Sequence, residues 1–253
     1  MDEPKAKYEP KAKYEPKAPK AKYDWSWIDR VWCINLVERG DRKQQIEQVA
    51  REYSLPITYY HPTRHPKGGE RGCWESHVHC IRTSYQRGDQ LALILEDDAV
   101  ATPALNPEAL EKIRGFIDTH PDWLLFYLGH FPNVWENVTR VSSGIYKGKF
   151  ILTHAYLVSR PMMSQLMHLD YLGVPYDVFI SQYSSYGIYP TLFDQRASES
   201  DIADRPTYWL REGGCKVSRW YGMALGVPIT MVLVALLLAL LILVACLFGC
   251  IET

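Results

Sequence analysis

One stretch of the sequence constrains the fold more than any other. Five apolar residues, 91–95, lead directly into the three carboxylates Glu96, Asp97 and Asp98. A short, continuous apolar run is typical of a strand buried on both faces. Because an unpaired carboxylate is costly to bury, we expect the acids at the carboxyl end of the strand, where open α/β sheets bind ligands.

The three acids have the chemistry of a cation site. Side chains alternate along a strand, so Glu96 and Asp98 should share one face and Asp97 should take the other. Two convergent carboxylates suit a hard divalent cation such as Mn²⁺ or Mg²⁺. The alternative is a solvated strand end that happens to be acidic, and this stretch alone does not separate the two interpretations.

The preceding segment predicts a βαβ unit. Residues 31–36 have the composition of a strand, 43–53 that of a helix with Ile46, Val49 and Ala50 inward, and 57–60 that of a second strand. This order indicates a largely parallel sheet. A loop at 61–72 then leads into a helix that we expect to reach about Gly88, with its positive end suited to a phosphate.

The rest of the globular part continues the alternation of helices and strands. The helix at 72–88 carries Trp74, His77, Val78, Ile81 and Tyr85 on one stripe. Further on we expect a helix at 107–120, a strand at 123–128 ended by Gly129, an irregular region at 130–150, a strand at 154–159, a helix at 161–168 and a late strand at 187–193.

Both ends of the chain differ from the middle. Residues 1–24 repeat the hexad KAKYEP and lack the apolar residues needed for a core, so we expect a disordered, semi-rigid tether. A docking tail for an anionic partner is the alternative interpretation. There is no apolar segment typical of a signal peptide near the N-terminus.

The C-terminal region predicts a membrane anchor. Residues 220–251 carry no charge, and the 24 residues 225–248 would extend about 36 Å as a helix. We expect a juxtamembrane linker at 211–222 and a transmembrane helix at 223–250, since a buried core helix would not be apolar on every side. Arg211, Lys216 and Arg219 precede the span, which predicts a single-pass, tail-anchored protein whose catalytic domain, 25–210, faces the cytosol.

Composition excludes some functions and leaves others open. The net charge of −1 gives no electrostatic basis for nucleic-acid binding. The 17 Tyr and 8 Trp are compatible with sugar stacking, although core packing explains most aromatic residues. Six cysteines form no CxxC pair, which favours free thiols in a reducing compartment over a zinc site or a disulfide scaffold.

Several motifs occur in an order typical of one enzyme family. Ile34-Asn-Leu precedes Arg39-Gly-Asp-Arg42; Gly69-Glu-Arg-Gly-Cys73 precedes Ser76-His77; and Leu95-Glu-Asp-Asp98 follows. Over about residues 28–205 the chain resembles glycosyltransferase family 25, which holds lipooligosaccharide and procollagen galactosyltransferases. Later matches are Leu128-Gly129, Ala155-Tyr-Leu157 with Ser159, Asp177, and Pro190 with Gln195 and Ser200.

The resemblance implies a fold and a reaction. The fold would be α/β, a GT-A-like (Rossmann-like) mixed sheet flanked by helices, with one C-terminal transmembrane helix. The enzyme would be an inverting, metal-dependent hexosyltransferase that moves a hexose, with galactose expected, from a nucleotide-sugar such as UDP-galactose to a glycan or glycoprotein acceptor. Glu96 and Asp98 would hold Mn²⁺ or Mg²⁺, and Asp177 would be the general base, with a helix N-cap as its alternative role.

The resemblance also implies a donor pocket. Its residues would be Asn35, Arg39, Arg42, Glu70, Ser76, His77 and Asp97, with the loop 69–73 along one wall. From the residues alone, His77 and His79 are more readily explained as core or cap residues than as metal ligands.

Two other function classes use the same acids. A metal-dependent phosphohydrolase or nuclease would need a second carboxylate cluster for a two-metal site, and the sequence shows none. A non-catalytic, membrane-anchored protein that only binds sugar nucleotides would have no need of all three acids.

Overall fold

The computed structural model describes residues 23–132 and 138–196, together with residues 234, 236–238 and 240. In chain order the elements are β1 (Arg30–Ile34), α1 (Gly40–Tyr53), β2 (Ile57–Tyr60), α2 (Gly69–Arg87), β3 (Leu91–Glu96), β4 (Ala99–Ala101), α3 (Pro107–Thr119), β5 (Leu125–Pro132), β6 (Thr139–Ser142), β7 (Ile145–Gly148), β8 (Phe150–Ser159), α4 (Arg160–Leu166), α5 (Tyr176–Ile180), β9 (Ser185–Ile188) and β10 (Phe193–Gln195).

The main sheet is mixed rather than largely parallel. Its strand order is β2-β1-β3-β8-β5-β9-β7-β6, and β10 pairs with β4 in a second, two-stranded sheet. The predicted βαβ opening is confirmed, since β1 pairs in parallel with both β2 and β3. The extension of that parallel pattern to the rest of the sheet is wrong, because β8 runs antiparallel to both of its neighbours, β3 and β5.

The region predicted to be irregular contains much of this antiparallel part. β6 and β7 form an antiparallel pair inside 130–150, and β8 begins at Phe150. β5 also continues past Gly129 to Pro132 instead of ending there. Short strands with polar residues on an outer face carry little apolar periodicity, so the sequence pattern does not reveal them.

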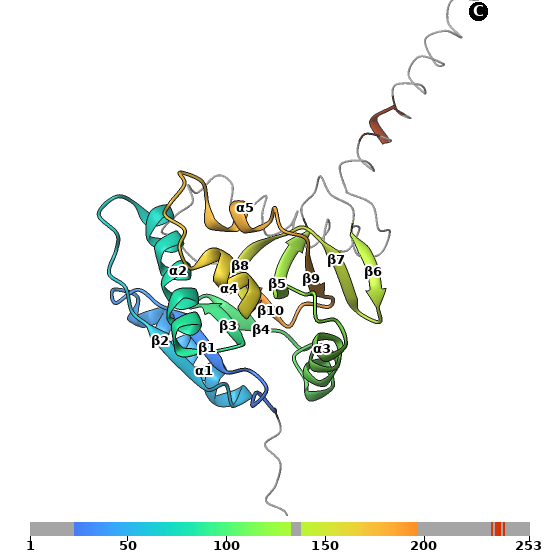
Figure 1. The fold of residues 1–253 in the computed structure, drawn as a ribbon, viewed down its shortest axis with the longest axis horizontal. Helices are drawn as coiled ribbons and strands as arrows, with labels where there is room; N and C mark the ends of the chain where they lie inside the picture. Colours follow the sequence, from blue (N-terminus) through green and yellow to red (C-terminus); the bar gives the residue numbers. More distant parts are fainter. Residues whose placement is uncertain (1–22, 133–137, 197–233, 235, 239, 241–253) are drawn as a thin grey trace, which may run out of the picture.

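Helices cover both faces of the sheet (Figure 1). One hydrophobic cluster joins α1 and α3 to one face through residues such as Ile46, Ile113 and Phe126. A second cluster joins α2, α4 and α5 to the opposite face and includes Trp74, Met163 and Ile180. Neighbouring residues of β1 point to opposite faces of the sheet, so Cys33 lies in the first cluster and Trp32 in the second.

The helix α2 follows its predicted stripe. Trp74, His77, Val78 and Ile81 are buried, and Tyr85 packs against the same cluster. The helix begins at Gly69, three residues before its expected start. Gly69 and Glu70, which the prediction placed in the preceding loop, therefore belong to the first turn of the helix.

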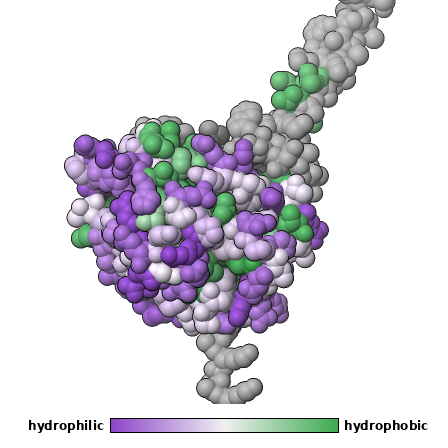
Figure 2. Space-filling view, in the orientation of Figure 1, coloured by the Kyte–Doolittle hydropathy of each residue, from purple (hydrophilic) through white to green (hydrophobic). Residues whose placement is uncertain are grey.

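The predicted tether at 1–24 and anchor at 223–250 fall almost wholly outside the described residues. Of the anchor, Val234, Leu236–Leu238 and Leu240 are described; they are helical, and each is more than half exposed. Within the described part of the chain, no helix combines the length and the apolar character needed to cross a bilayer. Elsewhere the visible face of the domain is mainly hydrophilic, with an apolar patch over the loop before α5, where Leu172 and Val174 are exposed (Figure 2).

Candidate active site

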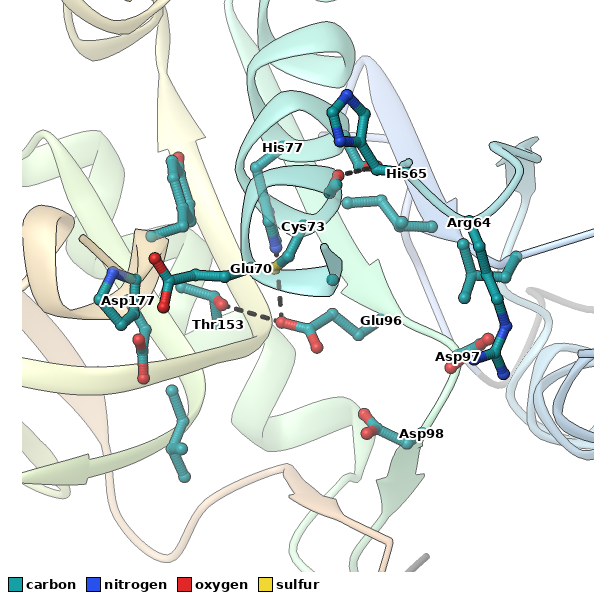
Figure 3. A pocket seen from close by; sticks show the side chains of 18 of the residues that line it. Arg64, His65, Glu70, Cys73, His77, Glu96, Asp97, Asp98, Thr153 and Asp177 are labelled. Carbon is teal, nitrogen blue, oxygen red and sulfur yellow. Dashed lines mark hydrogen bonds and ion pairs between the residues drawn. The ribbon is translucent and has the colours of Figure 1, made fainter. Parts of the chain in front are cut away.

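A cavity of about 390 Å³ lies at the carboxyl ends of β1 and β3. Ile34 and Glu96, the last residues of the two strands, are register partners and both border it. The amino end of α2 forms a second wall, and the start of α5 forms a third (Figure 3). The cavity is therefore at the sheet edge where the sequence predicted a ligand site.

All three acids border the cavity, but each has different partners. Glu96 accepts a hydrogen bond from the Thr153 hydroxyl at 2.8 Å. Asp97 accepts from the Asn35 amide at 2.8 Å and pairs with Arg42 at 3.0 Å. Glu96 and Asp97 face opposite layers, since Glu96 lies by His77 of α2 and Asp97 pairs with Arg42 of α1. The strand ends at Glu96 and the chain turns through the two aspartates, so Asp98 lies near Arg42 as well.

Asp98 is the acid with the least compensation. Its Oδ2 accepts from Gln195 at 3.2 Å and lies 3.6 Å from Arg42 Nη1. Its Oδ1 is buried and has no hydrogen-bond partner among the described residues. Burial raises the pKa of Asp98 above the usual range for an aspartate. Repulsion from the nearby carboxylates of Glu96 and Asp97 raises this pKa further.

The pKa of Glu96 is shifted in the opposite direction to that of Asp98. Burial acts to raise its pKa, but His77 and Thr153 outweigh that effect, and the pKa of Glu96 falls below its usual range. The His77 Nε2 atom lies 3.4 Å from Glu96 Oε1. The rim thus combines a carboxylate that stays ionised with a buried one that a cation would stabilise.

An irregularity in β8 brings Thr153 to Glu96. Gly129 pairs with Ala155 but Phe131 pairs with Ile151, so β8 has more residues than β5 between these two pairs. Leu152, inside this bulge, has a φ of 72°, which is an unfavourable conformation for a branched side chain. Bulges redirect side chains next to functional sites, and here Leu152 and Thr153 both border the cavity.

The second wall is suited to an anion. Gly68 precedes α2 with a φ of 102° and a ψ of 158°, a conformation essentially restricted to glycine. Gly68, Gly69, Arg64 and His65 all border the cavity. The first backbone N–H groups of a helix and a neighbouring guanidinium together favour phosphate oxygens.

Two further carboxylates lie across the cavity from Asp97 and Asp98. Figure 3 shows Glu70 and Asp177 on the side away from these aspartates, with Glu96 between. Glu70 accepts a short hydrogen bond from the Tyr171 hydroxyl. Asp177 lies in the first turn of α5 and accepts from the N–H of Val178 at 2.9 Å; because Pro175 is the N-cap, the alternative role of Asp177 as the cap is wrong.

The structure gathers most of the predicted site residues but not all. Those that border the cavity are Arg42, Glu70, Ser76, His77, Glu96, Asp97, Asp98 and Asp177. Asn35 and Arg39 are not part of its lining. Asn35 is buried and holds Asp97, while Arg39 pairs with Asp41 at 3.1 Å.

Several lining residues were absent from the sequence prediction. Arg64, His65, Thr153 and Tyr176 come from a loop, from the β8 bulge and from the start of α5. Gln195 belongs to one of the matched motifs, but no role was predicted for it. No spacing rule connects these positions to the acids, because the strand register and the bulge bring them together.

The donor set fits a divalent cation in part. Within the described ranges, no group of three or more His, Cys, Asp or Glu side chains is placed to hold a metal ion. Mg²⁺ is commonly bound by one or two carboxylates, with substrate phosphates and water completing its shell. Glu96, whose pKa is lowered, and Asp98 Oδ1, which has no hydrogen-bond partner in residues 23–132 and 138–196, match that arrangement.

Comparisons with known proteins give distant likenesses. No protein-family model and no curated protein matches the sequence, so the resemblance to glycosyltransferase family 25 stays a prediction. The fold is similar to the crystal structure of A197 from STIV, with a TM-score of 0.44 and 9% identity over 65% of this chain and 83% of that one.

Two enzymes are similar at a lower level. UDP-glucose pyrophosphorylase complexed with UDP-glucose has a TM-score of 0.36 and 9% identity over 66% of this chain and 74% of that one. Mannose-1-phosphate geranyltransferase from Thermus thermophilus has a TM-score of 0.35 and 13% identity over 61% of this chain and 58% of that one. Likenesses of this size assign no activity to the chain.

Proposed function

We propose that the cavity binds a nucleotide-sugar and transfers its hexose, with inversion, to a hydroxyl group of a glycan or glycoprotein acceptor. The observation that carries this proposal is the meeting, in one cavity, of three consecutive carboxylates with the glycine-led amino end of a long helix. The carboxylates are suited to a cation and the helix end to phosphate, and a nucleoside diphosphate with its metal needs both.

The basic residues support a diphosphate at this place. Arg42 of α1 and Arg64 of the loop between β2 and α2 both border the cavity. Arg42 already pairs with Asp97, which fixes its guanidinium next to the acids. Charge on a departing diphosphate would be stabilised by guanidinium groups and helix N–H groups that are oriented before the reaction begins.

Glu96 and Asp98 would hold Mn²⁺ or Mg²⁺. Such an ion, when bound, neutralises negative charge that develops on the leaving diphosphate. The protein's own contribution is to keep Glu96 ionised through Thr153 and His77, and to bury Asp98 beside Gln195 with one oxygen uncommitted.

Asp177 would remove the proton of the acceptor hydroxyl. It lies on the wall away from Asp97 and Asp98, so an acceptor could approach the sugar without displacing the diphosphate. Its carboxylate is anchored by the N–H of Val178, which leaves it oriented but not fully buried. A positioned base of this kind contributes about 10²- to 10⁴-fold in rate.

A donor screen tests the proposal. The full chain, purified in detergent, is incubated with Mn²⁺ and a panel of nucleotide-sugars that includes UDP-galactose, and release of nucleoside diphosphate is measured. We expect turnover with one nucleotide-sugar, abolished by excess EDTA and restored by Mn²⁺. Cleavage of phosphodiester substrates without any consumption of nucleotide-sugar would overturn the proposal and favour a phosphohydrolase.

A further inference from the structure

We propose that His77 is a positioning residue that orients Glu96 toward the cation and, through Tyr176, ties the helix carrying Asp177 to the same unit. The inference rests on the proposed function, since it concerns the carboxylates assigned to the cation and to the base. His77, Tyr156 and Tyr176, called here the histidine–tyrosine unit, are all buried, and His77 and Tyr176 border the cavity.

His77 is too buried to act by direct contact with a ligand over any large area. Its side chain has 0% exposure, although it borders the cavity. The imidazole stacks on the Tyr176 ring, with centroids 4.4 Å apart and planes 6° from parallel. A histidine enclosed in this way acts on a ligand through the groups it touches.

The two ring nitrogens of His77 face different partners. Nδ1 lies 3.0 Å from the Tyr156 hydroxyl, which is itself 3.2 Å from the Tyr176 hydroxyl. Nε2 lies 3.4 Å from Glu96 Oε1 and has no hydrogen-bond partner at normal distance among the described residues. A neutral imidazole has one N–H, so the hydroxyl at Nδ1 decides which nitrogen carries it.

This network directs the Nε2 hydrogen toward Glu96. If Tyr156 donates to Nδ1, the imidazole hydrogen is on Nε2, the nitrogen that lies 3.4 Å from Glu96 Oε1. Tyr176 can donate to Tyr156 in turn, so the two tyrosine hydroxyls and Nδ1 can all take part in hydrogen bonds. Together with the Thr153 hydroxyl at 2.8 Å, this leaves Oε2 of Glu96 as the oxygen available to a cation.

The same unit holds the third wall of the cavity in place. Tyr176 is the first residue of α5, and Asp177 follows it directly. Tyr176 is 1% exposed and contacts both His77 and Trp74 of α2 through its ring. The stacking of Tyr176 on His77 and its contact with Trp74 therefore both position Asp177 relative to Glu96.

Two matched substitutions separate the nitrogen contacts. The amide nitrogen of Gln can replace Nε2, whereas the shorter Asn can replace only Nδ1. Partners that orient metal-binding carboxylates contribute about 10- to 100-fold in metal affinity. We expect His77→Asn to weaken Mn²⁺ binding by about that factor, and His77→Gln to stay within about threefold of the unmodified chain.

The measurement is the Kd for Mn²⁺, obtained by electron paramagnetic resonance on the full chain in detergent without any nucleotide-sugar. Equal Mn²⁺ affinity in the Asn and Gln variants would overturn the inference. If thermal melting shows that His77→Asn does not fold, Tyr156→Phe decides, because it removes one oxygen and keeps the ring. That variant should also bind Mn²⁺ more weakly, and an unchanged Kd would overturn the inference.

The outcomes separate this inference from the proposed function. Binding of Mn²⁺ that follows the expected order, without turnover of any nucleotide-sugar, would overturn the proposed function and leave the role of His77 standing. Turnover of a nucleotide-sugar with equal affinities in the variants would do the reverse. A chain that binds no Mn²⁺ would overturn both.

Discussion

At the scale of single residues, Asp98 combines the poorest compensation with a central place in the site. Its Oδ1 is buried and has no hydrogen-bond partner within the part of the chain that the structure describes, and two other carboxylates lie nearby. We expect Asp98→Asn to lower turnover by about 100-fold or more, because the substitution removes a charged cation ligand. The melting temperature should stay unchanged or rise, because a buried, uncompensated charge is removed as well.

A surface aspartate provides the control for this prediction. Asp122 is exposed and does not border the cavity, so Asp122→Asn should change neither turnover nor melting temperature. Kinetic assays and thermal melts on the three chains give the comparison. A fall in melting temperature with full activity in Asp98→Asn would show that the residue is structural.

Asp177 has a different expected signature. Replacing it with Asn should lower kcat by about 10²- to 10⁴-fold with little change in the affinity for the donor, as expected for loss of a base. Asp170→Asn is the control, because Asp170 is exposed and does not border the cavity. If donor affinity falls in Asp177→Asn while kcat does not, Asp177 binds the donor instead.

At the scale of elements, Gly129 shows how the strands determine the site. A Cβ at Gly129 would clash with the His154 ring and would lie 2.6 Å from the Phe193 carbonyl of β10. We therefore expect Gly129→Ala to cost about 1–3 kcal/mol, and to lower activity because β10 carries Gln195 to Asp98.

A second glycine gives the opposite expectation. Gly115 lies within α3, and nothing is within 4 Å of a Cβ built there. Gly115→Ala should stabilise the protein by about 0.5–1 kcal/mol through helix propensity, with unchanged activity. Chemical denaturation measures both variants, and equal effects would contradict the close packing of β5 against β10.

The sequence predicted the elements with strong periodicity and missed the others. The buried run before Glu96, the stripe on α2 and the opening βαβ unit are local patterns, and they agree with the structure. β6, β7 and the bulge at Leu152 depend on pairing between distant segments, which no local pattern encodes. For this reason Thr153 was missed, although it holds Glu96.

At the scale of the whole molecule, the site is assembled between segments far apart in the sequence. Glu96 is predictable because three acids follow a buried strand, but its partners Thr153 and His77 come from β8 and α2. Tyr176 joins this group only because α5 packs on the same face as α2. The candidate site therefore depends on the sheet and both helix layers being formed together.

Two cysteines can show whether the two layers unfold together. Cys33 belongs to the cluster with α1 and α3, and Cys80 to the cluster with α2, α4 and α5. Both are free, fully buried thiols, and burial raises the pKa of each above the ordinary cysteine value, so neither offers a reactive thiolate in the native state.

We expect iodoacetamide to modify both cysteines at one common slow rate, which is set by global unfolding and is measured by mass spectrometry of their peptides. Low urea should accelerate the two rates equally. Modification of Cys80 many times faster than Cys33 would show instead that the α2 layer opens independently, and the cavity wall that it carries would then open with it.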